Sequence, residues 1–188
     1  MRSATSRPVR PDFNEILVYA LKSDGSVVTW GASWAGGDSS GVASQLTSGV
    51  TQIFSTGSAF AALKSNGSVV TWGNSSYGGN SSSVASQLTG GVTQIFSTSG
   101  AFAALKSDGS VVTWGDSFSG GNSSSVASQL TSGVTQIFST YPAFAALKSN
   151  GSVVTWGPSD RGGDSRSVAS QLTGGVTQIF SNGKHLQH

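Results

Sequence analysis

Few residues of this chain have the types and spacing that catalysis requires. The 188-residue sequence contains two histidines and no cysteine, and both histidines, His185 and His188, lie among the last four residues. Nucleophilic catalysis by serine needs a base beside the nucleophile, and these two imidazoles read best as part of a solvated tail. We therefore expect no catalytic residues and no enzyme activity.

An acidic or amide residue follows a glycine pair at four places in the sequence. These residues are Asp38, Asn80, Asn122 and Asp164. Calcium binds six to eight oxygen atoms and prefers several carboxylates at close spacing, whereas each place offers one such side chain and two of the four are amides. The pattern is more typical of side chains that shape turns. The sequence therefore predicts structural turns here, with no metal site and no cofactor.

Tryptophan and lysine each recur at a fixed position. The tryptophans are Trp30, Trp72, Trp114 and Trp156, and the lysines are Lys22, Lys64, Lys106 and Lys148. A ring of tryptophans could stack on sugars or bases, but their place on a strand between threonine and glycine favours a core role. A ring of lysines could attract an anion, but lysine beside a turn is typical of a solvated surface.

The segments that differ between the repeated parts are the best candidates for binding. They follow each Trp-Gly, and we interpret Trp34, Tyr77, Phe118 and Arg161 as occupants of one equivalent position. Tyr141 belongs to a second variable set, which precedes the next strand. Aromatic residues and arginine dominate binding hot spots, and loops on a rigid scaffold commonly carry function. We predict that these five residues form a binding surface.

These positions recur because the whole sequence is built from repeats. The segment LKS(D/N)GSVVTWG starts at Leu21, Leu63, Leu105 and Leu147, so that each start lies 42 residues after the one before. Most of the remaining unit recurs with it. A fixed period of this length indicates a repeat architecture. Hydrophobic residues make up 36% of the chain, which is enough for a packed core.

Each unit predicts a β-hairpin preceded by a short strand. In the second unit, VTQIFS (residues 50–55) is β-branched and bounded by glycines. The segments 59–65 and 68–73 then flank Asn66-Gly67, a dipeptide suited to a type I′ turn between antiparallel strands. For VASQLT the sequence leaves three alternatives: an edge strand, a helical turn or a loop. No segment has sustained helical periodicity, so the chain is all-β.

Apolar residues on both faces of the predicted strands require stacked sheets. Val70 and Trp72 would point to one side of the strand and Val69 to the other. Two-sided burial is found in propeller blades and solenoid rungs, and the alanine-rich strand suits an inner position near a propeller axis. We expect a β-propeller built from four 42-residue repeats, with three to four antiparallel strands per blade.

The repeat phase suggests how such a ring would close. The repeated part of the sequence begins with a predicted hairpin and ends with a predicted VTQIFS strand. Residues 177–181 would pair with residues 17–23 to close the ring in one chain, or two chains would combine into an eight-bladed ring. We assign residues 13–183 to the propeller domain, residues 1–12 to a disordered leader and residues 184–188 to a disordered tail.

The charge distribution limits the classes of partner that we expect the chain to bind. The formal net charge is +2, but three arginines lie in the first ten residues, and the remaining seven basic and eight acidic residues nearly cancel. Nucleic-acid binding needs a basic face, and no apolar run approaches the roughly 18 residues of a membrane span. We expect no nucleic acid and no membrane partner. A weakly charged body favours self-association, which makes a homodimer an open alternative.

The repeated run A-L-K-S-(D/N)-G-S-V-V-T-W-G, followed by a glycine pair and G-V-T-Q-I-F-S, resembles a known repeat. It is similar to the repeat of the regulator of chromosome condensation / β-lactamase inhibitor protein II superfamily. The resemblance covers all four units and implies β-propeller blades. It departs from the family after Trp-Gly, where Tyr77-Gly78-Gly79-Asn80 stands in place of G-Q-L-G. The resemblance therefore implies the fold and no particular function.

Together these observations favour a non-catalytic repeat scaffold that binds a protein partner through the loops after each Trp-Gly. One alternative is a lectin-like carbohydrate-binding module that uses the same aromatic residues. Another is a fragment of a longer repeat protein without an independent function.

Overall fold

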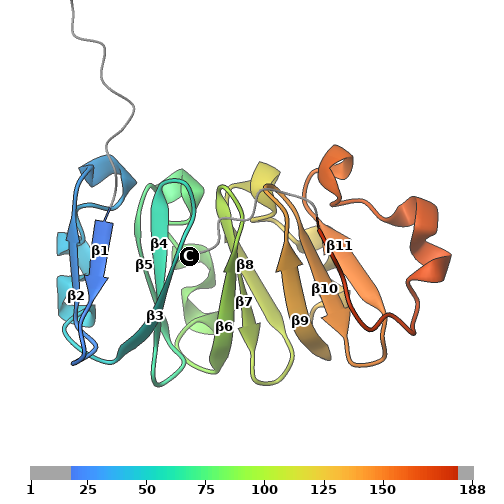
Figure 1. The fold of residues 1–188 in the computed structure, drawn as a ribbon, viewed down its shortest axis with the longest axis horizontal. Helices are drawn as coiled ribbons and strands as arrows, with labels where there is room; N and C mark the ends of the chain where they lie inside the picture. The colour runs from blue at the N-terminus through green and yellow to red at the C-terminus, as the bar shows by residue number, and fades with distance from the viewer. Residues whose placement is uncertain (1–17, 182–188) are drawn as a thin grey trace, which may run out of the picture.

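The computed structural model describes residues 18–181 as four antiparallel β-sheets stacked in a row (Figure 1). The strands are β1 (Val18–Leu21), β2 (Val27–Trp30), β3 (Val50–Ser55), β4 (Ala59–Lys64), β5 (Val69–Gly73), β6 (Val92–Ser97), β7 (Ala101–Lys106), β8 (Val111–Gly115), β9 (Val134–Ser139), β10 (Phe144–Lys148) and β11 (Val153–Trp156). The first sheet has two strands and the others have three. The predicted all-β, propeller-like repeat fold is confirmed. The predicted leader 1–12 and tail 184–188, with both histidines, lie outside the described residues.

The alanine-rich strand lies at the centre of each three-stranded sheet. β4 pairs with β3 on one side and with β5 on the other, and β7 and β10 hold the same place in their sheets. The register repeats, so that Phe60 lies opposite Trp72 and Phe102 opposite Trp114. The predicted inner position of the alanine-rich strand is therefore wrong. Its small side chains instead allow the central strand to pack closely against neighbours on both faces.

The hairpin turns use Asp-Gly or Asn-Gly as predicted, but they are not type I′ turns. A type I′ turn needs two consecutive residues with positive φ, and no described residue other than glycine has one. In the second repeat, Gly67 N–H donates to the Lys64 carbonyl at 2.8 Å, and Gly67 has φ +77°. Asn66 Oδ1 accepts from Ser68 N–H at 3.0 Å, which makes an Asx turn at negative φ. The left-handed residue must be glycine, because a Cβ on Gly67 would lie 2.7 Å from Gly91 N.

The helical elements among the described residues are all short 3-10 turns. They are η1 (Ser33–Ala35), η2 (Ser40–Gln45), η3 (Ser75–Tyr77), η4 (Ser82–Gln87), η5 (Ser117–Ser119), η6 (Ser124–Gln129), η7 (Ser159–Arg161) and η8 (Arg166–Gln171). In every repeat, the VASQ part of the ambiguous VASQLT segment thus forms the last four residues of a six-residue 3-10 turn. Within residues 18–181, no helix has the length and apolarity to cross a membrane.

The core consists of similar layers between neighbouring sheets. Val70 and Trp72 pack toward the first sheet, whereas Leu63 on the adjacent strand packs toward the third. In the next layer the ring of Phe102 stacks on that of Trp114, with centroids 5.2 Å apart and planes 25° apart. The prediction that each internal sheet buries both faces is confirmed.

A buried tryptophan joins each of the last three sheets to the repeat before it. The indole Nε1–H groups of Trp72, Trp114 and Trp156 donate to the carbonyl oxygens of Gly36, Gly78 and Gly120, each at 3.0 Å. The core role predicted for tryptophan therefore holds in these three repeats. Trp30 occupies the equivalent position in the first sheet and is exposed.

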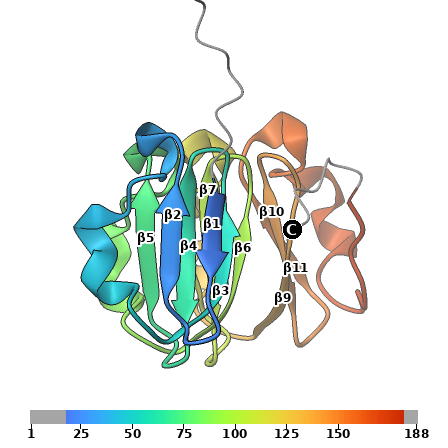
Figure 2. The same cartoon turned by 60° about the vertical axis from the view of Figure 1, so that its left-hand side comes forward.

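The four sheets form an open row. β1 and β2 lie at one end and β11 lies at the other (Figures 1 and 2). Residues 177–181, which were predicted to pair with the first sheet, are not in a strand, and β1 pairs with β2 alone. Closure within one chain is therefore wrong for this structure, because residues 176–181 lie beside the fourth sheet, where the Ser181 hydroxyl donates to the Ser139 carbonyl at 3.5 Å.

Candidate functional site

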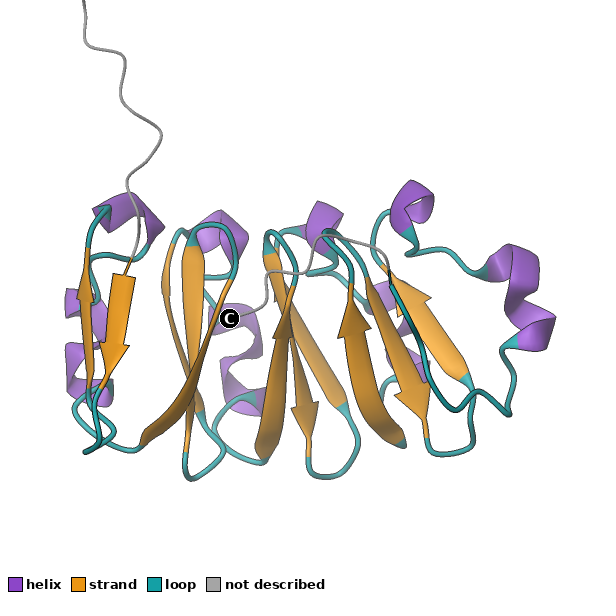
Figure 3. Ribbon diagram, viewed as in Figure 1, coloured by secondary structure: helices purple, strands orange, loops and turns teal. Residues whose placement is uncertain are grey.

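Two sets of loops meet along one long edge of the row of sheets, which we call the rim. One set consists of the short turns η1, η3, η5 and η7, which follow the second strand of each hairpin (Figure 3). The other consists of the connections at residues 56–58, 98–100 and 140–143. The two sets are hydrogen-bonded to each other: Asn74 N–H donates to the Ser58 carbonyl at 2.8 Å, and Asp116 N–H donates to the Gly100 carbonyl at 2.9 Å.

Neighbouring repeats are also linked along the rim. Gly57 N–H donates to the Ser99 carbonyl at 2.9 Å, and Ser99 N–H donates to the Tyr141 carbonyl at 2.8 Å. The buried Thr98 hydroxyl donates to the Ser119 carbonyl at 2.7 Å and thereby ties the two sets of loops together. Thr56 makes the same kind of contact with the Tyr77 carbonyl at 3.0 Å. These bonds hold the rim as one continuous backbone surface.

Sequence reasoning missed these threonines. The available signal was the threonine that ends each FST segment before the variable residues. A threonine at the end of a strand has many ordinary roles, so its link to a loop 21 residues further along the chain becomes visible only in the structure.

The short turns of the rim have a repeated construction. Asn74 Oδ1 accepts from Ser76 N–H at 3.0 Å, and Asp116 Oδ1 accepts from Phe118 N–H at 3.2 Å. Each turn ends on a left-handed glycine, and Gly78 has φ +98°. A Cβ on Gly78 would lie 2.7 Å from the Phe102 ring, so glycine is required there both by φ and by space.

The predicted equivalence of four rim residues is wrong by one position. Trp34 and Phe118 occupy the middle of their turns, whereas Tyr77 and Arg161 occupy the last position. The error arose because an aromatic residue or arginine occurs in every turn, although not at the same place. In the turns of Trp34 and Phe118, the last position is a small buried residue, Ala35 or Ser119.

The structure nevertheless brings the five predicted residues to the rim. The side chains of Trp34 and Phe118 are 63% and 81% exposed. Tyr77 and Tyr141 are also exposed, and a Cβ on Gly100 would lie 3.2 Å from the Tyr77 ring. Arg161 is exposed beside Asp160, with 3.5 Å between Nε and Oδ2. An exposed ion pair of this kind contributes little to stability, so both charges remain accessible to a partner.

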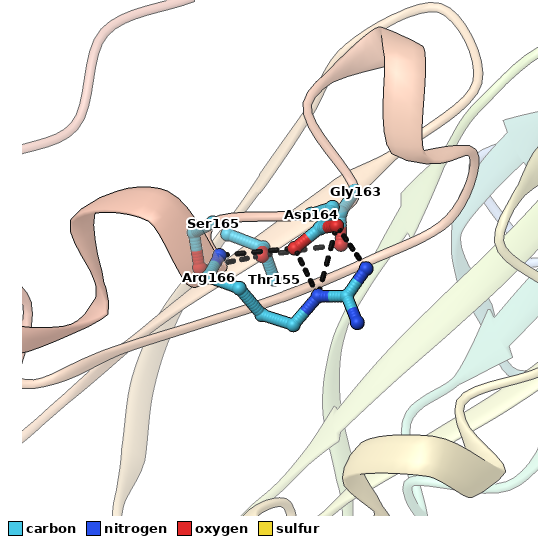
Figure 4. Close-up of polar contacts among 5 residues, drawn as sticks. All are labelled: Thr155, Gly163, Asp164, Ser165 and Arg166. Carbon is cyan, nitrogen blue, oxygen red and sulfur yellow. Dashed lines mark hydrogen bonds and ion pairs between the residues drawn. The ribbon is translucent and has the colours of Figure 1, made fainter.

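The residues after the glycine pairs form Asx turns, as predicted. In each turn, the side-chain oxygen of the aspartate or asparagine accepts a hydrogen bond from the backbone N–H two residues later, at 2.8–2.9 Å. The accepting and donating residues are Asp38 and Ser40, Asn80 and Ser82, Asn122 and Ser124, and Asp164 and Arg166. The fourth turn adds an ion pair, with 2.6 Å between Arg166 Nη2 and Asp164 Oδ2 (Figure 4). The hydrogen bonds from the Arg166 side chain and backbone lower the pKa of Asp164 to about 2.

The repeated lysines are engaged in structural contacts. The Nζ groups of Lys64, Lys106 and Lys148 donate to the carbonyl oxygens of Gln45, Gln87 and Gln129, at 2.7–3.1 Å. Within residues 18–181, no three histidine, cysteine, aspartate or glutamate side chains lie close enough together to hold a metal ion. The rim is therefore the candidate site that the described residues offer.

No family model matches the chain, and no curated protein matches it. Solved structures do. Human WBSCR16 is 22% identical with a TM-score of 0.48, over 81% of this chain and 50% of that one. The ectodomain of the Physcomitrella patens receptor kinase CR4 is 17% identical with a TM-score of 0.43, over 72% and 35%. The computationally designed Ika8 protein is 14% identical with a TM-score of 0.37, over 78% and 44%. The chain spans half or less of the length of these proteins, and at this distance they assign it no family or function.

Proposed function

We propose that the chain is a non-catalytic repeat scaffold that binds a protein partner through its rim. The observation that carries the proposal is the exposure of Trp34 and Phe118, at 63% and 81%, on short turns whose final glycine carbonyl accepts a hydrogen bond from the buried tryptophan of the next repeat. Large aromatic side chains on a rigid surface lose little conformational entropy on binding and are typical of hot spots.

The spacing of the rim residues suits a protein interface. Stacked sheets lie about 10 Å apart, and Trp34 and Phe118 are two repeats apart, so they are separated by about 20 Å. Tyr77 lies on the repeat between them, and Tyr141 and Arg161 extend the surface. A span of this size matches a partner surface of about 800 Å².

The polar groups beside the aromatic rings favour a protein over a carbohydrate. A sugar site needs free hydrogen-bonding groups next to the ring on which the sugar stacks. The Asp116 carboxylate already accepts from Phe118 N–H and, at 2.6 Å, from the Ser119 hydroxyl. Asn74 Oδ1 is engaged by Ser76 N–H. These groups maintain the turns and leave the aromatic faces as the principal contact surface.

Two further elements of the proposal rest on the sequence. The non-catalytic role follows from the small number of candidate bases, and membership of the regulator of chromosome condensation superfamily follows from the repeated Asp/Asn-Gly and Trp-Gly segments. The rim loops would then carry a function particular to this chain, because a repeat fold hosts many unrelated functions.

Affinity capture, identification of the captured protein and titration calorimetry with the purified pair would test the proposal. Changing both Trp34→Ala and Phe118→Ala should weaken binding by at least about 30-fold, the effect of losing one hot-spot residue. Trp30→Ala is the matched control, because Trp30 is an exposed tryptophan on β2 and is not part of a rim loop. Unchanged affinity in the double variant would refute the rim. Selective binding to a glycan array that the same double variant abolishes would favour the carbohydrate alternative.

A further inference from the structure

The outward face of the first sheet exposes side chains that are buried in every other sheet. Trp30 is 49% exposed, whereas its equivalent Trp114 is 3% exposed. Val28 is exposed, and its equivalents Val70 and Val112 are buried. Val18 and Ala20 lie opposite Trp30 and Val28 in the register of the first sheet and so share this face. No described element covers it (Figure 2). We call these four residues the N-terminal face.

The other end of the row exposes the opposite half of the same kind of interface. A cleft of about 920 Å³ lies between the fourth sheet and the chain that follows η8. Its apolar lining includes Ala145, Leu172, Val176 and Ile179. Leu172 and Val176 are half-buried, although the leucines and valines at these positions in the preceding repeats are buried.

The layer between the third and fourth sheets shows how the two ends would fit. It contains ten buried residues: Ala101, Ala103, Leu105, Leu130, Val134, Ile137, Phe144, Ala146, Val154 and Trp156. One period further along the chain, the first six correspond to Ala143, Ala145, Leu147, Leu172, Val176 and Ile179, which we call the C-terminal face. The last four, Phe144, Ala146, Val154 and Trp156, lie three periods after Val18, Ala20, Val28 and Trp30, the residues of the N-terminal face. The two ends of the row are therefore the two halves of an interface that the chain already makes internally.

The backbone at the C-terminal face supports the same match. A Cβ on Gly36, Gly78 or Gly120 would lie 2.7–2.9 Å from a phenylalanine ring of the following sheet, but one on Gly162 would meet no atom within 4 Å. Gly49, Gly91 and Gly133 each lie against a lysine side chain, but Gly175 does not. Val18 is in phase with these phenylalanines and Lys22 with these lysines, so a valine and a lysine of a second copy could lie against Gly162 and Gly175.

The first sheet also lacks the strand that residues 176–181 would supply. In the second sheet, VTQIFS pairs with the central strand, with Ile53 opposite Ala62 and Phe54 opposite Ala61. The equivalent partners are Ile179 with Ala20 and Phe180 with Tyr19. β1 has no partner on this edge among the described residues, and Phe180 is 83% exposed.

We propose that the C-terminal face of one chain docks onto the N-terminal face of a second copy, with residues 176–181 added to β1 of that copy as a third strand. The contact reproduces the internal layers: Trp30 Nε1–H donates to the Gly162 carbonyl, Lys22 Nζ donates to the Gln171 carbonyl, and Ser23 N–H donates to the Gly175 carbonyl. The interface is heterologous, so repeated docking gives a ring when the rotations close.

Mass photometry of three variants tests the proposal. The unchanged protein should assemble to an integer multiple of its 19.0 kDa monomer mass. Trp30→Glu damages only the N-terminal face, and Phe180→Glu damages only the strand 176–181 that the C-terminal end contributes to the contact. Each variant alone should associate at least about 30-fold more weakly. Trp34→Glu is the matched control, because it places the same charge on an exposed tryptophan of the rim, and it should assemble normally.

Mixing the two end-face variants gives the decisive result. The intact C-terminal face of the Trp30→Glu chain should bind the intact N-terminal face of the Phe180→Glu chain. The product should be a dimer and nothing larger, because its outer ends are both damaged, and its formation shows that both variants are folded. A monomeric unchanged protein overturns the proposal, and so does an assembly that survives either substitution or a mixture that stays monomeric. Neither face includes Trp34 or Phe118, the two residues whose substitution tests the rim, so these outcomes can be distinguished from loss of partner binding.

Discussion

The four equivalent tryptophans allow one substitution to be compared in different surroundings. We predict that Trp114→Ala lowers the free energy of unfolding much more than Trp30→Ala does. Trp114 is 3% exposed, stacks on Phe102 and donates to the Gly78 carbonyl at 3.0 Å. Trp30 is 49% exposed.

The magnitude follows from these contacts. A tryptophan side chain buries about 200 Å², so the two positions differ by about 90 Å², which corresponds to about 2 kcal/mol. Loss of the indole also leaves the Gly78 carbonyl without its buried partner, at a cost of at least about 1 kcal/mol. Trp114→Ala should therefore cost about 3 kcal/mol more than Trp30→Ala, within the usual range of about 3–5 kcal/mol for removing a buried large aromatic side chain.

Urea unfolding followed by far-ultraviolet circular dichroism would measure both changes. Each substitution should be made in the Phe180→Glu background, so that no second copy covers Trp30. Trp156→Ala, at a position that is also buried, should behave like Trp114→Ala. Equal losses at positions 30 and 114 would refute the conclusion that the tryptophans join successive sheets.

Three further predictions concern the loops. Thr98→Val should lower the free energy of unfolding by about 1–3 kcal/mol, because it leaves the Ser119 carbonyl without a buried donor, and thermal unfolding that matches the unchanged protein would contradict this. Gly78→Ala should lower the melting temperature, because alanine is strained at φ +98° and its Cβ would meet a phenylalanine ring. The matched control Gly162→Ala has a similar φ but open space around its Cβ, so it should lower the melting temperature less. Hydrogen bonds from Ser26 and Ser110 lower the pKa of Asp24 and Asp108 below the ordinary value of 3.8, so these carboxylates stabilise the fold above about pH 4 and lose that effect as the pH falls through their folded-state pKa. Replacing both with asparagine, the residue that the other two hairpins use, should reduce the loss of melting temperature between pH 5 and pH 2, and an unchanged acid profile would argue against these turns as acid-sensitive elements.

The sequence was sufficient for the features that depend on local pattern. The repeated dipeptide before SVVTWG located the hairpins, and the alternation of Val69, Val70 and Trp72 showed that both faces of the sheet are buried.

The features that failed depend on geometry that no single segment specifies. The turn type was wrong because the Asn66 side chain forms its own hydrogen bond to Ser68 N–H. Closure within the chain was wrong because it depends on how the four sheets are arranged along the whole row, and residues 176–181 remain beside the fourth sheet. The rim residues were placed correctly as a group, but Tyr77 was assigned the position that Ser76 holds, because residue type was weighed above spacing.

Hydrogen exchange of the five tryptophan indole N–H groups, measured by NMR, tests most directly the account of one repeated interface with a free rim. In the Phe180→Glu variant, the indoles of Trp72, Trp114 and Trp156 should be protected, because each donates to a buried carbonyl. Trp30 and Trp34 should exchange freely in that variant. In the unchanged protein Trp30 should join the protected group, while Trp34 stays unprotected until a rim partner is added. Fast exchange at Trp114, or protection of Trp34 in the isolated protein, would contradict the account.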